Sequence, residues 1–482
     1  MKSLDKFVES LARMPTETSW VEFKHDNYDP TMIGERISGL ANAAAIEDRA
    51  CAYMIWGVHD KTHAIVGASE DLQTIKIGND ELEGWLRQRL SRNVDFKFET
   101  TTVQGKRIGV LSVTAAVGYP VSFLKNDYIR FGSITRKLNE FAEKRGQLWD
   151  KLRNSKFEVR IAKDELSVAE VVALLDCQSY FDLKSIPFPT NQDGIIHYFC
   201  EEGLTVKQDN GLYSITNLGA ILFAKRLSDF PSVSRKAIRV VKYKGDNKLE
   251  MEHDETGSKG YAIGYEGLIK YVCALTPSSE PINLALREKQ SAYPVIAIRE
   301  AIANALIHQD FTITGAGPLV EIFSNRIEIT NPGASLVDVM RIVDTPPKSR
   351  NEKMAALMRQ MNMCEEAGSG WDKIVISCEM MNLPPPKAIS YEEATNVRLF
   401  SKLPFSRIAN ESKLLACYWH ACVRQVQEDQ LTNNSLRIRF GLPESSAGII
   451  SRLIKEAVEN NLIKPFDSNA GRKYMRYIPI WA

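Results

Sequence analysis

Alternating and periodic apolar positions organise the first third of the chain. The short apolar segments VEFK (21–24) and CAYMIWGV (51–58) predict buried strands, and the period of TMIGERISGLANAAA (31–45) predicts a helix between them. Three alternating segments that predict half-buried strands follow at 96–103, 107–113 and 127–136. This mixture predicts an α/β domain over residues 1–154.

The remaining pattern predicts two further domains. A helical period over 295–311 precedes PLVEIFSNRIEITNPG (318–333), whose two apolar runs predict a hairpin, so an α+β sandwich is expected over 160–405. The last segment, 408–482, shows three helical periods and a closing strand, which is the pattern of a winged helix. The expected fold class is therefore α+β multidomain.

The charge composition excludes a strongly basic protein. The chain has 61 Lys+Arg and 60 Asp+Glu, a net charge of +1, so a nucleic-acid partner must be recognised by a local patch. Residues 408–482 carry ten Lys/Arg against seven Asp/Glu, and this net charge of +3 (10 − 7) gives mild support for nucleic-acid contact there. Packing or dimerisation through that domain is an equally weighted alternative.

Cysteine usage and hydropathy indicate a reducing compartment. The eight cysteines are scattered without a paired CxxC framework, as in cytosolic proteins. Cys417, His420 and Cys422 come nearest to a metal cluster, but core packing is favoured because a fourth ligand is not evident. No apolar run approaches a membrane span and the N-terminus lacks an apolar signal segment, so a cytoplasmic protein without a membrane partner is expected.

Charged residues crowd the first predicted strand. In a strand, Glu22 and Lys24 share one face while Val21 and Phe23 point into the core. Glu17 lies near a turn from which it can fold back toward Glu22, and Asp60 ends the next strand. Three converging carboxylates with a lysine suit one or two Mg²⁺ or Mn²⁺ ions, which activate water at a phosphodiester. On the pattern alone, a solvated charged face remains the commoner explanation.

A second group of polar residues follows the strand at 127–136. Its hydroxyls and cations are donors suited to phosphate oxygens, which makes nucleic-acid contact a candidate role. A charged strand edge that keeps the protein soluble is an equal alternative. The candidates are Arg130, Ser133, Thr135, Arg136 and Lys137.

The helix predicted over 295–311 carries a third candidate site. Glu300, Asn304 and His308 are spaced at i, i+4 and i+8 and therefore lie near one face. A carboxylate that orients water and an amide oxygen that holds Mg²⁺ suit a nucleoside triphosphate site. Spacing alone favours a polar helix face with apolar residues buried behind it.

The N-terminal motifs resemble those of the Schlafen-like AlbA-2 domain family. The shared features are E-x-x-x-x-E-F-K, ISGLANAAA, GVHD and YIRFGSITR, in the same order over about 140 residues. The resemblance implies nucleic-acid contact, and in the nuclease-active branch it implies a metal-dependent RNase site. Glu17, Glu22 and Asp60 fall on the metal-binding positions of that site and Lys24 on its lysine. The loop AAAIEDRACAY departs from the family's Gly-Gly helix end.

The central motifs resemble a divergent ATPase module related to GHKL ATPases. REAIANALIHQDF, IEITNPGASL and RNEKMAALMRQMNMCEEAGSGWDKI keep the family's order over about 200 residues. The resemblance implies ATP binding with Glu300 as the catalytic glutamate and Asn304 as the Mg²⁺ ligand. Asn331, in NPGAS with Gly333, replaces the aspartate that accepts from adenine, and an asparagine accepts without charge. Gly368 and Gly370 resemble the glycine-rich phosphate lid.

Three functions are expected from these patterns. The first is a metal-dependent endoribonuclease that acts on tRNA or other structured RNA, is gated by ATP and serves in bacterial stress or phage defence. The second is an ATP-responsive DNA-binding transcriptional regulator whose carboxylates are only structural. The third is an ATPase that remodels a partner. Homo-oligomerisation is expected by analogy with the two families.

Overall fold

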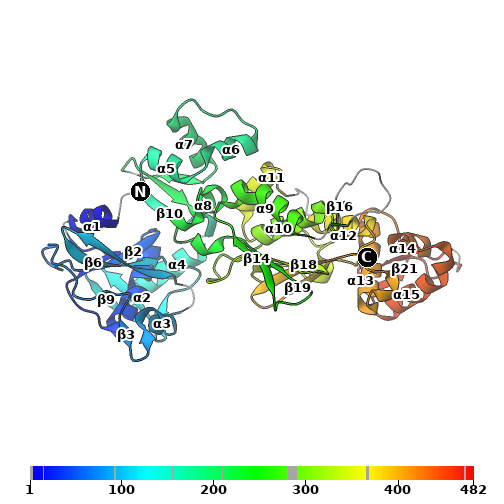
Figure 1. Ribbon diagram of the computed structural model, residues 1–482, viewed down its shortest axis with the longest axis horizontal. Coiled ribbons are helices and arrows are strands. Elements are labelled where there is room, and N and C mark those ends of the chain that lie inside the picture. The colour runs from blue at the N-terminus through cyan, green and yellow to red at the C-terminus, as the bar shows by residue number, and fades with distance from the viewer. Residues whose placement is uncertain are drawn as a thin grey trace. The chain divides into compact units, whose positions relative to one another are not determined.

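The computed structural model describes residues 4–14, 16–91, 94–154, 157–208, 210–276, 278–279, 290–364, 369–471 and 474–482. Figure 1 shows its helices and strands. The chain divides into two compact units, each described by itself below. The first comprises Met1–Lys236, Ser258–Gly260 and Phe311–Ala316, and the second Ala237–Gly257, Tyr261–Asp310 and Gly317–Ala482.

A four-stranded sheet of order β1-β2-β6-β5 forms the centre of the N-terminal region. Strand β1 pairs parallel with β2, and the other pairs are antiparallel. Helices α1 and α2 contribute to separate apolar clusters, α1 with Val21, Phe23 and Ile55, and α2 with Met54 and Trp56. The expected α/β organisation of this region is present. Its elements are α1 (Leu4–Ala12), β1 (Val21–Lys24), α2 (Pro30–Ile46), β2 (Cys51–Trp56), β3 (Lys76–Ile77), β4 (Asp80–Glu81), α3 (Leu82–Arg87), β5 (Phe96–Val103) and β6 (Lys106–Thr114).

Helix α2 also supports a small sheet of β7 (Ser122–Phe123), β8 (Asn126–Phe131) and β9 (Ile134–Lys137). Ser38 donates to the carbonyl of Val121 at 2.6 Å, and the Asn42 amide donates to the carbonyls of Val121 and Tyr128. A Cβ at Gly34 would lie 2.2 Å from the Phe123 ring, so only glycine permits this approach. Ser38 and Asn42 of ISGLANAAA therefore hold β8 against α2, and Gly34, which precedes that motif, lets β7 approach the helix.

The first unit continues beyond the N-terminal region. Its second sheet has the order β10-β12-β11, and three helices, over 168–174, 192–201 and 217–223, contact it. Because residues 160–236 cluster with the N-terminal region, the domain expected over 160–405 is shared between the two units. The elements are η1 (Leu138–Glu140), α4 (Ala142–Asn154), η2 (Phe157–Val159), β10 (Ile161–Leu166), α5 (Val168–Leu174), α6 (Cys177–Lys184), α7 (Gln192–Glu201), β11 (Thr205–Lys207), β12 (Tyr213–Thr216), α8 (Asn217–Phe223), η3 (Leu227–Asp229) and η4 (Ser234–Lys236).

A six-stranded mixed sheet of order β14-β13-β17-β18-β20-β19 forms the main part of the second unit. The expected hairpin is β17–β18, and the expected long helix is α10, which packs against β18 and α12 and ends at Ile307. The elements are β13 (Arg239–Tyr243), β14 (Met251–Thr256), α9 (Tyr261–Leu275), β15 (Ser278–Ser279), β16 (Gln290–Ser291), α10 (Val295–Ile307), β17 (Leu319–Ile322), β18 (Arg326–Pro332), η5 (Val339–Arg341), α11 (Glu352–Gln360), α12 (Gly370–Met380), β19 (Lys387–Ser390) and β20 (Ala394–Phe400).

The C-terminal segment has three helices and a two-stranded antiparallel sheet around its own apolar cluster. Its assignment as a winged helix stays a prediction. Cys417 and Cys422 are buried, and His420 bonds to Glu379 at 2.9 Å and to Ser435 at 3.0 Å, so these residues serve packing, as the sequence favoured. The elements are η6 (Phe405–Arg407), α13 (Asn410–Val426), α14 (Asn433–Arg439), η7 (Glu444–Ser446), α15 (Ala447–Glu459), β21 (Ile463–Pro465) and β22 (Tyr477–Pro479). Of the helices described, none is both long and apolar enough to cross a membrane.

Burial of the thiols gives a first testable prediction. Desolvation raises the pKa of Cys51, Cys378, Cys417 and Cys422 to about 12 and that of Cys177 to about 11. A raised pKa leaves less thiolate at pH 8, so reaction with an aromatic disulfide reagent is suppressed. We expect rapid modification of at most Cys200, Cys273 and Cys364, which are partly exposed, and of all eight thiols after denaturation. Rapid native reaction of Cys417 or Cys422 would contradict this packing.

Candidate functional site

The first candidate site forms where the chain folds back on β1. Thr18 pairs with Val21 in an isolated antiparallel bridge, and the Glu17 carboxylate accepts from the Phe23 backbone N–H at 2.9 Å. Val21 and Phe23 are buried in an apolar cluster, as the strand pattern predicts. Glu22 is fully buried as well and joins a separate group of polar side chains. Glu17 and Glu22 are thus brought together.

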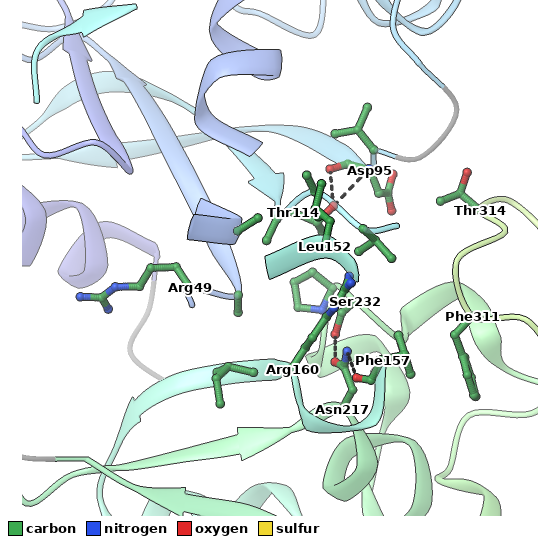
Figure 2. A pocket seen from close by; sticks show the side chains of 18 of the residues that line it. Arg49, Asp95, Thr114, Leu152, Phe157, Arg160, Asn217, Ser232, Phe311 and Thr314 are labelled. Atoms are coloured by element: carbon green, nitrogen blue, oxygen red, sulfur yellow. Dashed lines mark hydrogen bonds between the residues drawn. The ribbon is translucent and has the colours of Figure 1, made fainter. Parts of the chain in front are cut away.

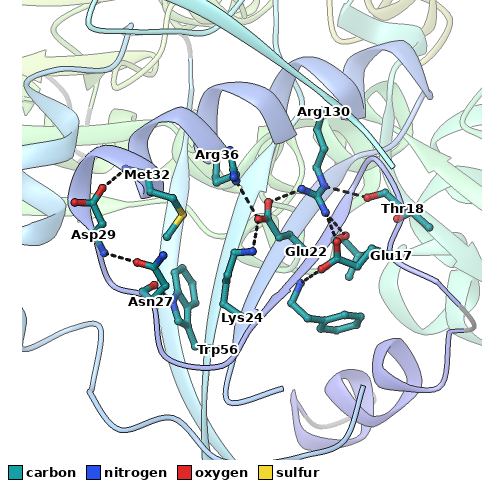
Figure 3. A network of polar contacts seen from close by, with 12 residues as sticks. Glu17, Thr18, Glu22, Lys24, Asn27, Asp29, Met32, Arg36, Trp56 and Arg130 are labelled. Carbon is teal, nitrogen blue, oxygen red and sulfur yellow. Dashed lines mark hydrogen bonds and ion pairs between the residues drawn. The ribbon is translucent and has the colours of Figure 1, made fainter. Parts of the chain in front are cut away.

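A single arginine from β8 connects these two carboxylates. Arg130 is 2% exposed and donates to Glu22 and to Glu17, each at 2.7 Å, and to the carbonyl of Thr18 at 3.1 Å (Figure 3). Burial lowers the pKa of the Arg130 guanidinium, and the charges of Glu22 and Glu17 act in the opposite direction. Buried charges are tolerated only when they are paired and hydrogen-bonded, and this geometry meets both conditions.

Two further cations converge on Glu22 (Figure 3). Lys24 lies 3.0 Å and Arg36 2.9 Å from the same carboxylate oxygen, and both side chains are about one-fifth exposed. The predicted sharing of a face by Glu22 and Lys24 is therefore correct. Three cations meet two carboxylates, so this cluster of Glu17, Glu22, Lys24, Arg36 and Arg130, called the Arg130 cluster below, carries a net charge of +1.

The expected metal site of Glu17, Glu22 and Asp60 is not assembled. Within the part of the chain that the structure describes, no three His, Cys, Asp or Glu side chains are grouped so that they could hold a metal ion. Asp60 follows β2, whereas Glu17 and Glu22 turn toward β8. The pairing of β1 with β2 brings the backbones together, but Asp60 is exposed and is not grouped with the carboxylates that Arg130 holds.

The predicted phosphate-contacting residues divide into two groups. Arg130 is 2% exposed and its guanidinium is held between the carboxylates of Glu17 and Glu22, so in this structure it is not presented at the surface. Ser133, Arg136 and Lys137 are exposed on the β8–β9 hairpin, and Thr135 is partly buried. A nucleic-acid role for these four residues stays a prediction.

The Arg130 cluster gives a stability prediction. We expect Arg130→Met to lower the free energy of unfolding of the first unit by about 3–5 kcal/mol, because it leaves buried carboxylates without their cation. The matched control, Arg136→Met on the same hairpin, is expected to change it by less than about 0.5 kcal/mol, because Arg136 is exposed. Urea denaturation followed by circular dichroism measures both. Equal effects of the two substitutions would show that the cluster has no structural role.

The second candidate site is a cavity of about 640 Å³ inside the second unit. Glu300, Asn304 and His308 all line it, so the predicted helix face is correct. Glu300 is 7% exposed on α10, and His308 caps the helix by donating its backbone N–H to the carbonyl of Asn304 at 2.9 Å. The volume lies within the range of small-molecule sites and suits a nucleotide.

Helix α12 begins at this cavity. A Cβ built on Gly370, its first residue, would lie 2.9 Å from the Glu300 carboxylate and 3.4 Å from the Asn304 amide. Glycine therefore lets the positive end of the helix dipole approach Glu300 and Asn304, which is a favourable position for phosphate. Gly370 stands where the lid was predicted, while Gly368 lies outside the described residues.

Asn331 lines another part of the cavity, and Gly333 lies beside it. Asn331 lines the cavity, is 5% exposed and donates its amide to the carbonyl of Pro332 at 3.1 Å. Gly333 has φ = 101°, which favours glycine, and its carbonyl accepts from Thr395 at 2.8 Å. A Cβ at Gly333 would lie 2.8 Å from Asp310. Gly333 thus has a backbone role beside the site.

Arg350 is a cavity residue that the sequence did not single out. Its guanidinium donates to the carbonyl of His308 at 2.9 Å and to that of Ala334 at 2.7 Å. The next residue, Asn351, is buried and donates to the carbonyls of Ile307 and Gln309. Arg350 and Asn351 therefore hold the end of α10. Their position at the start of RNEKMAAL is the sequence feature that could have identified them. Lys348 and Arg359 add two further lining cations.

The environment of His308 gives a pH prediction. Burial, and secondarily the charge of Arg350, lowers the pKa of His308 to about 4. A lowered pKa keeps the imidazole neutral above about pH 5, so His308 does not change charge between pH 6 and 8. Proton NMR of the ring C–H groups tests this, with His308→Gln identifying the resonance among the seven histidines. Titration near pH 6.5 would contradict the geometry.

Together, these features define a multidomain α+β protein with a buried ion-pair cluster in one region and a nucleotide-sized cavity in another. Residues 17–139 match the family model described as Schlafen, AlbA_2. Residues 315–399 match the HATPase_c_4 model, described as Putative ATP-dependent DNA helicase recG C-terminal. The chain therefore carries a Schlafen AlbA-2 domain followed by an ATPase-like domain, which confirms both predicted resemblances and relates the chain to nucleic acids and to ATP.

The matched ranges relate directly to the two sites. All five residues of the Arg130 cluster fall inside the first, and Asn331, Gly333 and Gly370 inside the second, while α10 precedes the second. Among solved structures, the crystal structure of the DIP2311 protein from Corynebacterium diphtheriae aligns at 15% identity and a TM-score of 0.43, covering 98% of this chain and 96% of that one. No curated protein matches the chain.

Proposed function

We propose that this chain is a nucleic-acid-binding protein whose binding responds to ATP. The observation that carries the proposal is the engagement of Glu17 and Glu22 by Arg130. In that arrangement the carboxylates stabilise the AlbA-2 domain rather than a metal ion. The partly exposed Lys24 and Arg36 and the exposed Arg136 and Lys137 supply cations for phosphate contact.

The ATP side of the proposal rests on the cavity of the second unit. Asn304 would hold Mg²⁺ through its amide oxygen, and Glu300 would orient a water molecule toward the terminal phosphate. The cavity also brings Arg350 and Lys348 near the start of α12, which supplies positive charge for a polyphosphate. Neutral Asn331 in place of a carboxylate would accept from a base without adding charge.

A nuclease is the second candidate, and one observation favours it. Glu17 and Glu22 do meet at one place, and Lys24 lies beside them. Cleavage of RNA would require Arg130 to leave the carboxylates and a metal ion to take its place. Since removing one partner of a buried ion pair is unfavourable by several kcal/mol, the cluster disfavours this exchange.

Binding and cleavage are tested in one experiment. Purified protein is incubated with total tRNA and with duplex DNA, with and without Mn²⁺ and Mg-ATP, and both complex formation and strand length are measured. We expect a salt-dependent complex whose affinity changes with ATP, and uncut nucleic acid. A Mn²⁺-dependent product that is lost in Glu22→Gln would overturn the binding proposal in favour of the nuclease.

Matched variants separate the two domains in this assay. Arg136→Gln with Lys137→Gln is expected to weaken binding of nucleic acid about tenfold or more, because two phosphate contacts are lost. Arg145→Gln, exposed on α4, serves as the charge control. Asn304→Ala is expected to remove the response to ATP and leave basal nucleic-acid binding intact. An unchanged ATP response in Asn304→Ala would place the nucleotide elsewhere.

A further inference from the structure

A second cavity, of about 510 Å³, lies inside the first unit (Figure 2). Its wall combines the end of α2, the β5 and β6 strands and α4 with residues 157–161, 231–236 and 311–315. The cavity therefore lies where the AlbA-2 region meets the segment that follows it in the same unit. None of its lining residues belongs to the Arg130 cluster or to the ATP cavity.

Part of this wall is apolar and aromatic. The rings of Phe157 and Phe311 stack with centroids 4.1 Å apart and planes 4° apart, and Phe311 is 5% exposed. Leu152 and Ile161 extend the apolar surface. A rigid apolar wall of this kind suits the flat body of a small organic molecule.

The charged part of the wall is predominantly cationic. Six lining residues are Lys or Arg and two are Asp: Arg49, Arg87, Lys151, Arg160, Arg235 and Lys236 against Asp48 and Asp95. Both acids are engaged by cations of the same wall. Asp95 lies 3.4 Å from Arg87 and 3.6 Å from Arg235, and Asp48 pairs with Lys151.

The cavity wall still has more cations than acids when Arg49 is left out of the count. Arg49 extends away from the centre of the cavity toward Asp164 and Glu165, so it is not counted as a ligand contact (Figure 2). Lys236 is 5% exposed, and its ammonium donates to the carbonyls of Ile313 and Ala316. Arg160 extends its guanidinium into the cavity. Burial lowers the pKa of Arg160 to about 10, so the group remains cationic at neutral pH.

We propose that this cavity binds a small organic anion with a flat apolar body and one phosphate or carboxylate group. The anionic group contacts Arg160 and Arg235, and the apolar body lies along the Phe157–Phe311 wall. A ligand in this position contacts residues of both parts of the unit, so it stabilises their association by an amount that grows with the logarithm of its free concentration above Kd. The proposal is independent of the nucleic-acid and ATP functions proposed above.

Phenyl phosphate is the probe for the proposed site. Inorganic phosphate and benzoate are titrated separately for comparison. Calorimetric titration of the full chain is expected to show one site for phenyl phosphate, with weaker binding of inorganic phosphate, which lacks the apolar body. Benzoate binding as tight as that of phenyl phosphate would identify a carboxylate site, and weaker benzoate binding a phosphate site. No heat with any of the three probes at millimolar concentration would overturn the proposal.

Variants locate the binding. Arg160→Met is expected to weaken phenyl phosphate at least tenfold, while Arg145→Met, an exposed arginine of α4, leaves it unchanged. Phe311→Leu, which keeps an apolar side chain, is expected to weaken phenyl phosphate but not inorganic phosphate. The circular dichroism spectrum and the thermal unfolding midpoint serve as folding controls. Equal binding in Arg160→Met and wild type, or loss of binding in Asn304→Ala, would assign the probe to another site.

Discussion

The buried guanidinium of Arg130 is the interaction on which the N-terminal domain depends. It joins β8 to β1 and to the turn directly before β1, and Arg130 lies 108 residues beyond Glu22 in the chain. Burial makes each of these charges unfavourable alone, and only their mutual pairing makes them tolerable. The close approach of β8 to α2, which Ser38, Asn42 and Gly39 permit, places Arg130 where the pairing is possible. One cluster thus explains the charges of VEFK and the small residues of the following helix together.

The cavity of the second unit follows a comparable logic, in which backbone geometry places the side chains that line it. Arg350 and Asn351 hold the carbonyls at the end of α10, and this fixes the helix face that presents Glu300 and Asn304. Gly370 allows α12 to begin against those two side chains. In the proposed ATP function, positive charge for a polyphosphate would come from a helix dipole and from the lining cations rather than from a single motif.

The local sequence pattern predicted the direction of side chains better than it predicted which charged residues pair. The alternation in VEFK placed Val21 and Phe23 in the core, and the spacing in REAIANALIH placed three residues in one cavity, because strand and helix periods fix side-chain direction. The partner of Glu22 was misjudged for a physical reason. Whether a buried carboxylate meets a metal ion or an arginine is decided by residues distant in sequence, and the local pattern around Arg130 favours a phosphate contact as readily as a carboxylate. Asp60 was predicted from strand adjacency, which does not determine where a residue beyond the strand end points.

The state of the two carboxylates decides between a structural and a catalytic AlbA-2 domain. Titration of the full chain with Mn²⁺, with bound ion counted by electron paramagnetic resonance in wild type and in Glu17→Gln with Glu22→Gln, tests this most directly. We expect the same number of bound Mn²⁺ ions in both proteins, because Arg130 occupies the carboxylates. One additional tightly bound Mn²⁺ in wild type that is lost in the double variant would contradict it.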